Sequence, residues 1–154
     1  MKFNNKHKNL LNLISGKDLQ QDLEINGVVY KISSIKNNDH TWIAEGMENT
    51  DSTLLLIKKR KDRMVASSIL AIAEPGGDFT YKPDMFDLPD SEYGKSLQKN
   101  EDALNTYYND CMLELVQMMN EKVVSLLYSK VTELNQKVEE AIVDSTPFLK
   151  AQDA

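Results

Sequence analysis

Side chains that catalyse reactions or bind metals are sparse in this sequence. The two histidines, His7 and His40, lie far apart in the chain, and Cys111 is the single cysteine. A structural zinc site needs about four Cys or His ligands, so the chain cannot supply the usual set. Gly76-Gly77 lacks the Lys-Ser/Thr pair of a phosphate-binding loop, and no nucleophile elbow surrounds a serine. We therefore predict no catalytic residues, no metal ligands and no bound cofactor.

Two positions could support chemistry but have a plainer interpretation. His40 follows Asp39 and lies near Trp42, so it could act as a base, yet the pattern is more typical of the polar first turn of a helix. Cys111 falls on an apolar helical stripe, which favours a small buried side chain over a reactive thiol.

The most unusual local feature is the basic run KKRKDR at residues 58–63. Six successive helical residues sweep about 600°, so charge would cover every face of a helix there. Three interpretations stay open: a solvated span between two packed ends, a contact with an acidic protein surface such as the chain's own C-terminal half, or a phosphate contact. No aromatic residue interleaves with these charges to stack on bases, so nucleic acid is the least favoured. The candidate contact residues are Lys58, Lys59, Arg60, Lys61 and Arg63.

Charge divides the 154-residue chain into two unlike halves. Residues 1–73 carry 11 basic and 8 acidic side chains, a net charge of +3, whereas residues 74–154 carry 7 and 16, a net charge of −9. The halves can attract each other or attract different partners. The lone cysteine permits no intrachain disulfide and fits a reducing compartment. No apolar run approaches the roughly 20 residues of a membrane helix, and the N-terminus does not fit a signal peptide, so we expect the protein to work where it is made.

A heptad seam lies in the segment VVSLLYSKVTELNQKVEEAI, residues 123–142. Apolar residues recur there at steps of three and four, and such a seam must be buried against something. The same spacing serves a helix packed within its own chain and a helix that docks on a partner, and we keep both alternatives. The candidate partner contacts are Val124, Leu127, Val131, Leu134 and Val138.

The elements that position these residues begin with a β-hairpin at residues 23–33. Asn26-Gly27 is a strong signal for a two-residue type I′ turn, which pairs Ile25 with Val28. An isolated hairpin is marginal in water, so helices or another subunit must cover its apolar face. That face is formed by Leu23, Ile25, Val28, Tyr30 and Ile32.

Helices are predicted to follow the hairpin. Asp39 is the expected N-cap of a short helix, and Asp51 or Ser52 caps a longer one that runs to Pro75-Gly76-Gly77. Its apolar stripe includes Leu54, Leu55, Ile57, Met64, Val65, Ile69 and Ile72.

The remaining chain divides into an extended linker, a helical region and a tail. Residues 78–100 lack periodicity, residues 101–146 form one long helix or a pair that bends or breaks near Asn120, and residues 147–154 are a tail. Residues 1–22 form an arm or short helix, and residues 23–77 hold the hairpin and its helices. The predicted fold class is therefore α+β, mostly helical.

This order of elements resembles the small tail-assembly and baseplate-hub proteins of contractile-tailed bacteriophages. The residues that carry the resemblance are the hairpin LEINGVVYKISSI, the Trp-containing helix, the segment RMVASSILAIAEPGG and the late helix MNEKVVSLLYSKVTELNQKVEEAI. In the late helix the matching positions are Val123, Val124, Leu127, Tyr128, Val131 and Leu134.

The resemblance implies a structural or assembly role without catalysis. Expected partners are other phage tail or baseplate proteins, with self-association as a further option, and the expected location is the virion tail or baseplate, or the host cytoplasm during assembly. The alternative is a small regulatory adaptor that homodimerises or binds one partner through its C-terminal helix.

Overall fold

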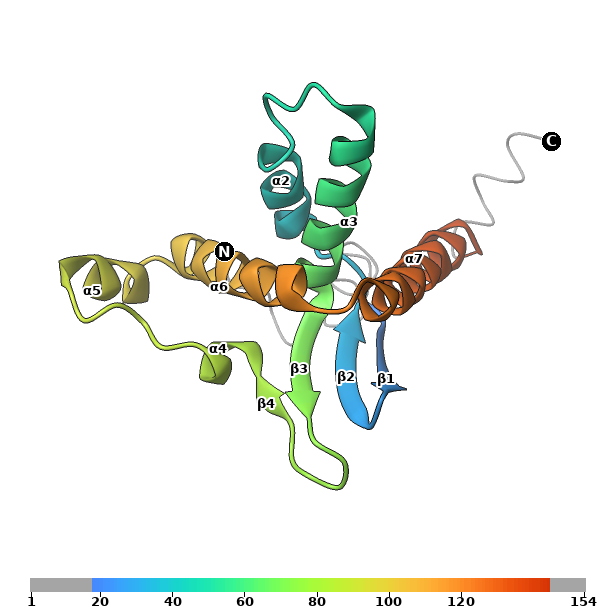
Figure 1. Cartoon of the computed structure of the whole chain (residues 1–154), viewed down its shortest axis with the longest axis horizontal. Coiled ribbons are helices and arrows are strands. Elements are labelled where there is room, and N and C mark those ends of the chain that lie inside the picture. The colour runs from blue at the N-terminus through green and yellow to red at the C-terminus, as the bar shows by residue number, and fades with distance from the viewer. Residues whose placement is uncertain (1–17, 145–154) are drawn as a thin grey trace, which may run out of the picture.

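The fold is α+β and mostly helical, as predicted, in the computed structural model, which describes residues 18–144. A four-stranded antiparallel sheet has the order β1-β2-β3-β4. Helices α6 and α7 cross above the sheet, and α2 and α3 rise beyond them (Figure 1). The predicted tail and residues 1–17 of the predicted arm lie outside the described residues.

The hairpin is confirmed, but it begins earlier than predicted: residues 20–22, assigned to the N-terminal arm, pair with β2 and belong to β1. Strands β1 (Gln20–Ile25) and β2 (Val28–Ser33) flank Asn26 and Gly27, whose φ angles of 53° and 83° are those of a type I′ turn. Ile25 pairs with Val28 as expected. The apolar face is covered from within the chain, because Ile25, Tyr30 and Ile32 belong to the same core cluster as α3, α6 and α7.

Helix α2 (Asn37–Glu45) begins earlier than predicted. Its N-cap is Lys36, so the assignment of Asp39 as N-cap is wrong. Asp39 lies inside the first turn and is buried, where its carboxylate accepts hydrogen bonds from α6.

Helix α3 (Thr53–Ser68) starts as predicted but ends early. Ser52 caps it by accepting a hydrogen bond from the Leu55 amide. The predicted helix to Pro75 is wrong, because Ile69–Ala73 forms strand β3 and pairs with β2. ILAIA is a short, continuous apolar run, which fits a helix or a buried strand equally well. Pairing with β2 of the hairpin satisfies its backbone groups and decides for the strand.

The predicted linker contains three short elements. These are strand β4 (Thr80–Tyr81), which pairs with β3, and helices α4 (Lys82–Met85) and α5 (Glu92–Gln98). The segment is therefore not a free linker: β4 completes the sheet, while α4 and α5 pack on β3 and α6.

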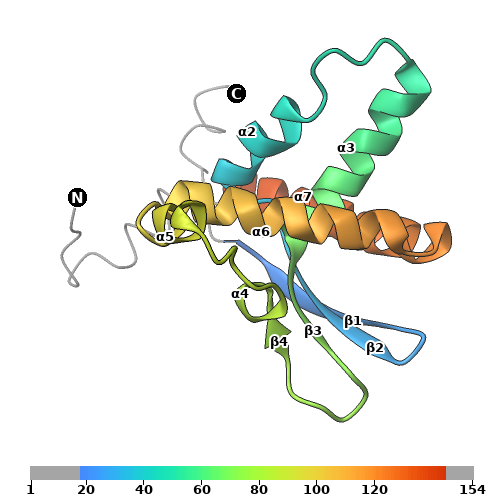
Figure 2. The ribbon, with the colours of Figure 1, turned by 60° about the vertical axis from the view of Figure 1, so that its left-hand side comes forward.

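The C-terminal region is two helices, α6 (Glu101–Met118) and α7 (Glu121–Asp144). The break falls at Met119 and Asn120, where it was predicted, and the Asn120 side chain accepts a hydrogen bond of 2.9 Å from the Lys122 amide. Both helices pack on α3, which continues directly into β3 (Figures 1 and 2). α3 is thus the central element of the fold.

Candidate functional site

The heptad seam of α7 faces the interior of its own chain. Val124, Leu127, Val131 and Leu134 are at most 3% exposed and lie in the main core cluster. This corrects their assignment as partner contacts, because side chains packed against the sheet and α3 are not accessible while the chain keeps this fold. Val138 is half-buried and lines a pocket of about 260 Å³ together with His40 and Arg60.

Two residues of the basic run contact the chain's own acidic half. The Lys61 ammonium lies 2.9 Å from Glu121 of α7 and also donates to the Ser125 hydroxyl, and Lys58 lies 3.5 Å from Glu121. The hydrogen bond from Lys61 and the charge of Lys58 lower the pKa of Glu121. The nearby carboxylate of Asp62, and then that of Glu121, raise the pKa of Lys58. The interpretation of a contact with the acidic C-terminal half therefore holds for these two lysines.

Arg63 has a different role from the rest of the run. Its guanidinium stacks 3.8 Å from the centroid of the Trp42 ring and donates to the Trp42 carbonyl, so it ties α3 to α2. Burial lowers its pKa. Lys59 donates to the Thr50 hydroxyl, and Arg60 is exposed, without an ion pair to any described residue.

The first turns of α3 carry an exposed apolar surface formed by residues of the predicted apolar stripe. Leu54 is 80% exposed, Leu55 46% and Ile57 61%, and we call these three side chains the α3 apolar face. The N-terminal half of α3 rises away from α6, α7 and the sheet (Figure 2), so no described element covers it. Scattered exposed leucines are ordinary, but three in four successive residues on a projecting helix are typical of a contact surface.

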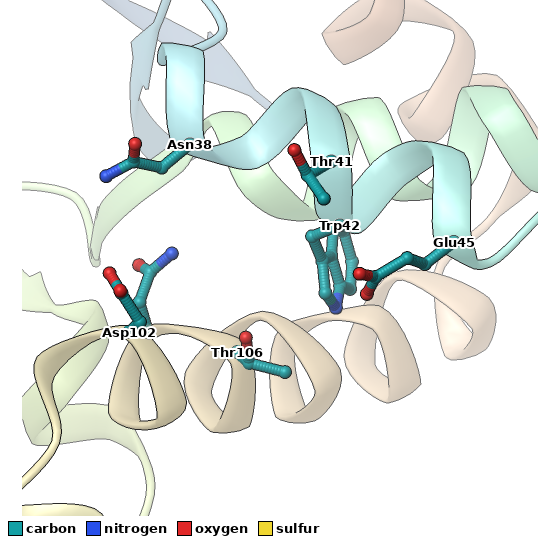
Figure 3. Close-up of a pocket in the computed structure, with 7 residues that line it drawn as sticks. Asn38, Thr41, Trp42, Glu45, Asp102 and Thr106 are labelled. Carbon is teal, nitrogen blue, oxygen red and sulfur yellow. The ribbon is translucent and has the colours of Figure 1, made fainter.

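A polar groove separates α2 from α6 (Figure 3). Asn38 and Asp102 face each other at one end, and Trp42 and Glu45 lie at the other. The Trp42 indole spans to α6 and donates a 3.0 Å hydrogen bond to Asp110. The groove has a volume of about 290 Å³ and is lined by Asn38, Thr41, Trp42, Glu45, Asp102, Asn105 and Thr106.

Beside this groove lies a buried polar network that joins four segments. The Lys82 ammonium donates to the Ala66 carbonyl at the end of α3, at 2.8 Å, and to the Asn109 amide oxygen, at 3.0 Å. The Asn109 amide nitrogen in turn donates to Asp39. Burial lowers the pKa of Lys82 to about 8, although the negative charge of Asp39 partly opposes this shift. Every member has a polar partner, so the network acts as a structural tie between α2, α3, α4 and α6.

The side chains first considered for chemistry are not assembled into a reactive group. His40 is exposed, whereas the neighbouring Asp39 carboxylate turns to Asn105 and Asn109. Cys111 is half-buried, and burial raises the pKa of its thiol, which disfavours the reactive thiolate. Within residues 18–144 no three His, Cys, Asp or Glu side chains lie close enough to hold a metal ion.

Comparisons of the chain with protein families, with curated proteins and with solved structures found no match. Among the described helices, none is both long enough and apolar enough to cross a membrane.

Proposed function

We propose that this chain is a non-catalytic structural or assembly protein of a bacteriophage tail or baseplate, either a hub component or an assembly chaperone. It acts through protein–protein surfaces, in the virion tail or baseplate or in the host cytoplasm during assembly. The order of elements that carries the resemblance supports this proposal: a hairpin with an Asn-Gly turn, a Trp-containing helix, a central helix and a late helix with an apolar seam.

The observation that carries the proposal is the α3 apolar face. Leu54 and Ile57 expose 80% and 61% of their surface on a helix that projects from the body. When a partner removes such apolar side chains from water, the free energy falls by about 25 cal/mol per Å² of apolar surface buried. A protein whose work is assembly needs a surface of this kind.

The test is a gentle affinity purification of the full chain from its native source, followed by mass spectrometry. We expect recovery with tail tube, hub or wedge proteins in a fixed ratio, and loss of that recovery with Leu54→Asp. Leu126→Asp is the matched control, because Leu126 is also an exposed helical leucine, at 53%, but lies on α7. Recovery alone would contradict the proposal, and recovery with one soluble cellular protein would favour the adaptor alternative.

A further inference from the structure

The way α7 meets α3 shows which kind of helix α3 accepts. Glu121, in the first turn of α7, pairs with Lys58 and Lys61 of α3, and Val124, three residues later, is almost fully buried. The contact therefore combines an acidic side chain on the basic run with an apolar side chain directed inward. Such an arrangement fixes the register of the two helices by charge and stabilises them by burial.

The same face of α3 continues past the end of this contact. Residues three or four apart are neighbours on a helix, so Leu54 lies one turn before Lys58, in line with it and with Lys61. Ile57 borders this row, since it lies three residues after Leu54 and four before Lys61. Beyond Lys58, towards the start of α3, no described element covers the row.

The positively charged side chains on this part of α3 favour a negatively charged partner. Arg60 is exposed and has no ion pair with a described residue. Lys58 keeps 56% of its side chain exposed although it pairs with both Asp62 and Glu121. A basic partner would be repelled here, whereas acidic side chains would find Arg60 and Lys58 beside the α3 apolar face.

We propose that the α3 apolar face, together with Lys58 and Arg60, is the docking site for an acidic amphipathic helix of a partner protein. The inference rests on the proposed assembly function and names the chemistry of its partner. The bound helix lies beside the start of α7 and extends the layer that α7 forms on α3. Its apolar residues cover Leu54 and Ile57, and its acidic residues point towards the middle of α3, where the basic run lies.

The test introduces the photoreactive residue benzoylphenylalanine in place of Leu54 in the full chain, in its native source. Cross-linked peptides are then identified by mass spectrometry, with the same residue in place of Leu126 as the control. We expect the Leu54 position to capture one acidic segment with apolar residues at helical spacing. A synthetic peptide of that segment should bind the purified chain. Its affinity should fall at least tenfold with Ile57→Asp and several-fold with Arg60→Glu. The affinity for the wild-type chain should also fall as the salt concentration rises.

Three results would overturn the inference. These are capture of a basic or uncharged segment or of nucleic acid, capture of a second copy of this chain, or no capture at Leu54 beyond that at Leu126. Co-purification with tail proteins combined with any of these results would leave the proposed function standing, so the two failures can be told apart.

Discussion

The seam of α7 and the apolar face of α3 look alike in sequence but have opposite environments. Both are apolar stripes at helical spacing. For the seam, packing within the chain and docking on a partner were both left open, and Leu127 is fully buried in the core. Leu54 belongs to the predicted apolar stripe of α3, yet it is 80% exposed. Periodicity therefore shows that a helix has a face to cover, but not which surface covers it.

Geometry explains the difference. α7 lies across the sheet and α3, so its seam meets the apolar face of the hairpin and the buried half of α3. α3 has 16 residues and is about 24 Å long, and its buried residues all lie in the C-terminal half, from Asp62 onwards. Its first turns extend beyond the body.

The largest expected difference between the two regions is in stability. Leu127→Asp should lower the free energy of unfolding by about 4 kcal/mol or more, or prevent folding, because it puts a carboxylate in the core. Leu54→Asp should change it by no more than about 0.5 kcal/mol, because that side chain is already in water. Urea denaturation followed by far-ultraviolet circular dichroism measures both. Equal losses of unfolding free energy in the two variants would contradict the assignment of the α7 seam to the core and of Leu54 to the surface.

A second prediction concerns what anchors the buried half of α3. Lys82, bound to the last carbonyls of α3, has a pKa of about 8 in the folded chain against an ordinary 10.5. Between these values the unfolded chain binds more protons, so stability rises with pH. From pH 7.5 to 9.5 the wild type should gain about 2 kcal/mol relative to Lys82→Met, measured by urea denaturation at both pH values. If the free energies of unfolding of the wild type and Lys82→Met differ by the same amount at both pH values, burial does not lower the pKa of Lys82.

A smaller effect is expected where α2 is tied to α3. A Cβ at Gly46 would overlap the guanidinium of Arg63, which stacks on Trp42 and donates to its carbonyl. Gly46→Ala should therefore displace Arg63 and cost about 1–2 kcal/mol, although the right-handed helical conformation of Gly46, with φ of −70°, would by itself favour alanine over glycine. Thermal unfolding measures the loss, and a neutral or stabilising result would show that Arg63 moves aside freely.

The smallest effect is expected at the border between the covered and uncovered parts of α3. Glu121 is exposed, so its ion pairs with Lys58 and Lys61 are screened by water. Glu121→Gln should lower the unfolding temperature slightly in dilute buffer and not at all in about 1 M salt. The lowered pKa of Glu121 predicts that its contribution is present above the ordinary pKa of Glu and is lost as pH falls through the folded value. An equal effect in high salt would point to packing instead of charge.

The predictions that held depend on local chemistry. The turn at Asn26-Gly27, the cap at Ser52 and the break near Asn120 follow from backbone preferences of residues close in sequence. Strand β3 was missed because ILAIA fits a helix or a strand, and only the neighbouring β2 decides between them.

The candidate site was less predictable from the sequence, because it depends on how helices that are distant in the sequence pack on one another. The polar network of Lys82 joins residues up to 70 positions apart, and no local pattern reveals it. The basic run was recognised in the sequence. That its lysines pair with Glu121, whereas Arg63 stacks on Trp42, follows only from the way α2 and α7 pack on α3.

The sequence by itself determined the hairpin, the positions of most helices and the existence of two apolar helical faces, since these follow from turn chemistry and the period of 3.6 residues. The tertiary structure alone decided which face became core and which stayed exposed. The reason is that burial depends on contacts between distant segments: α7 folds back over the sheet and α3, and no described part of the chain reaches the first turns of α3.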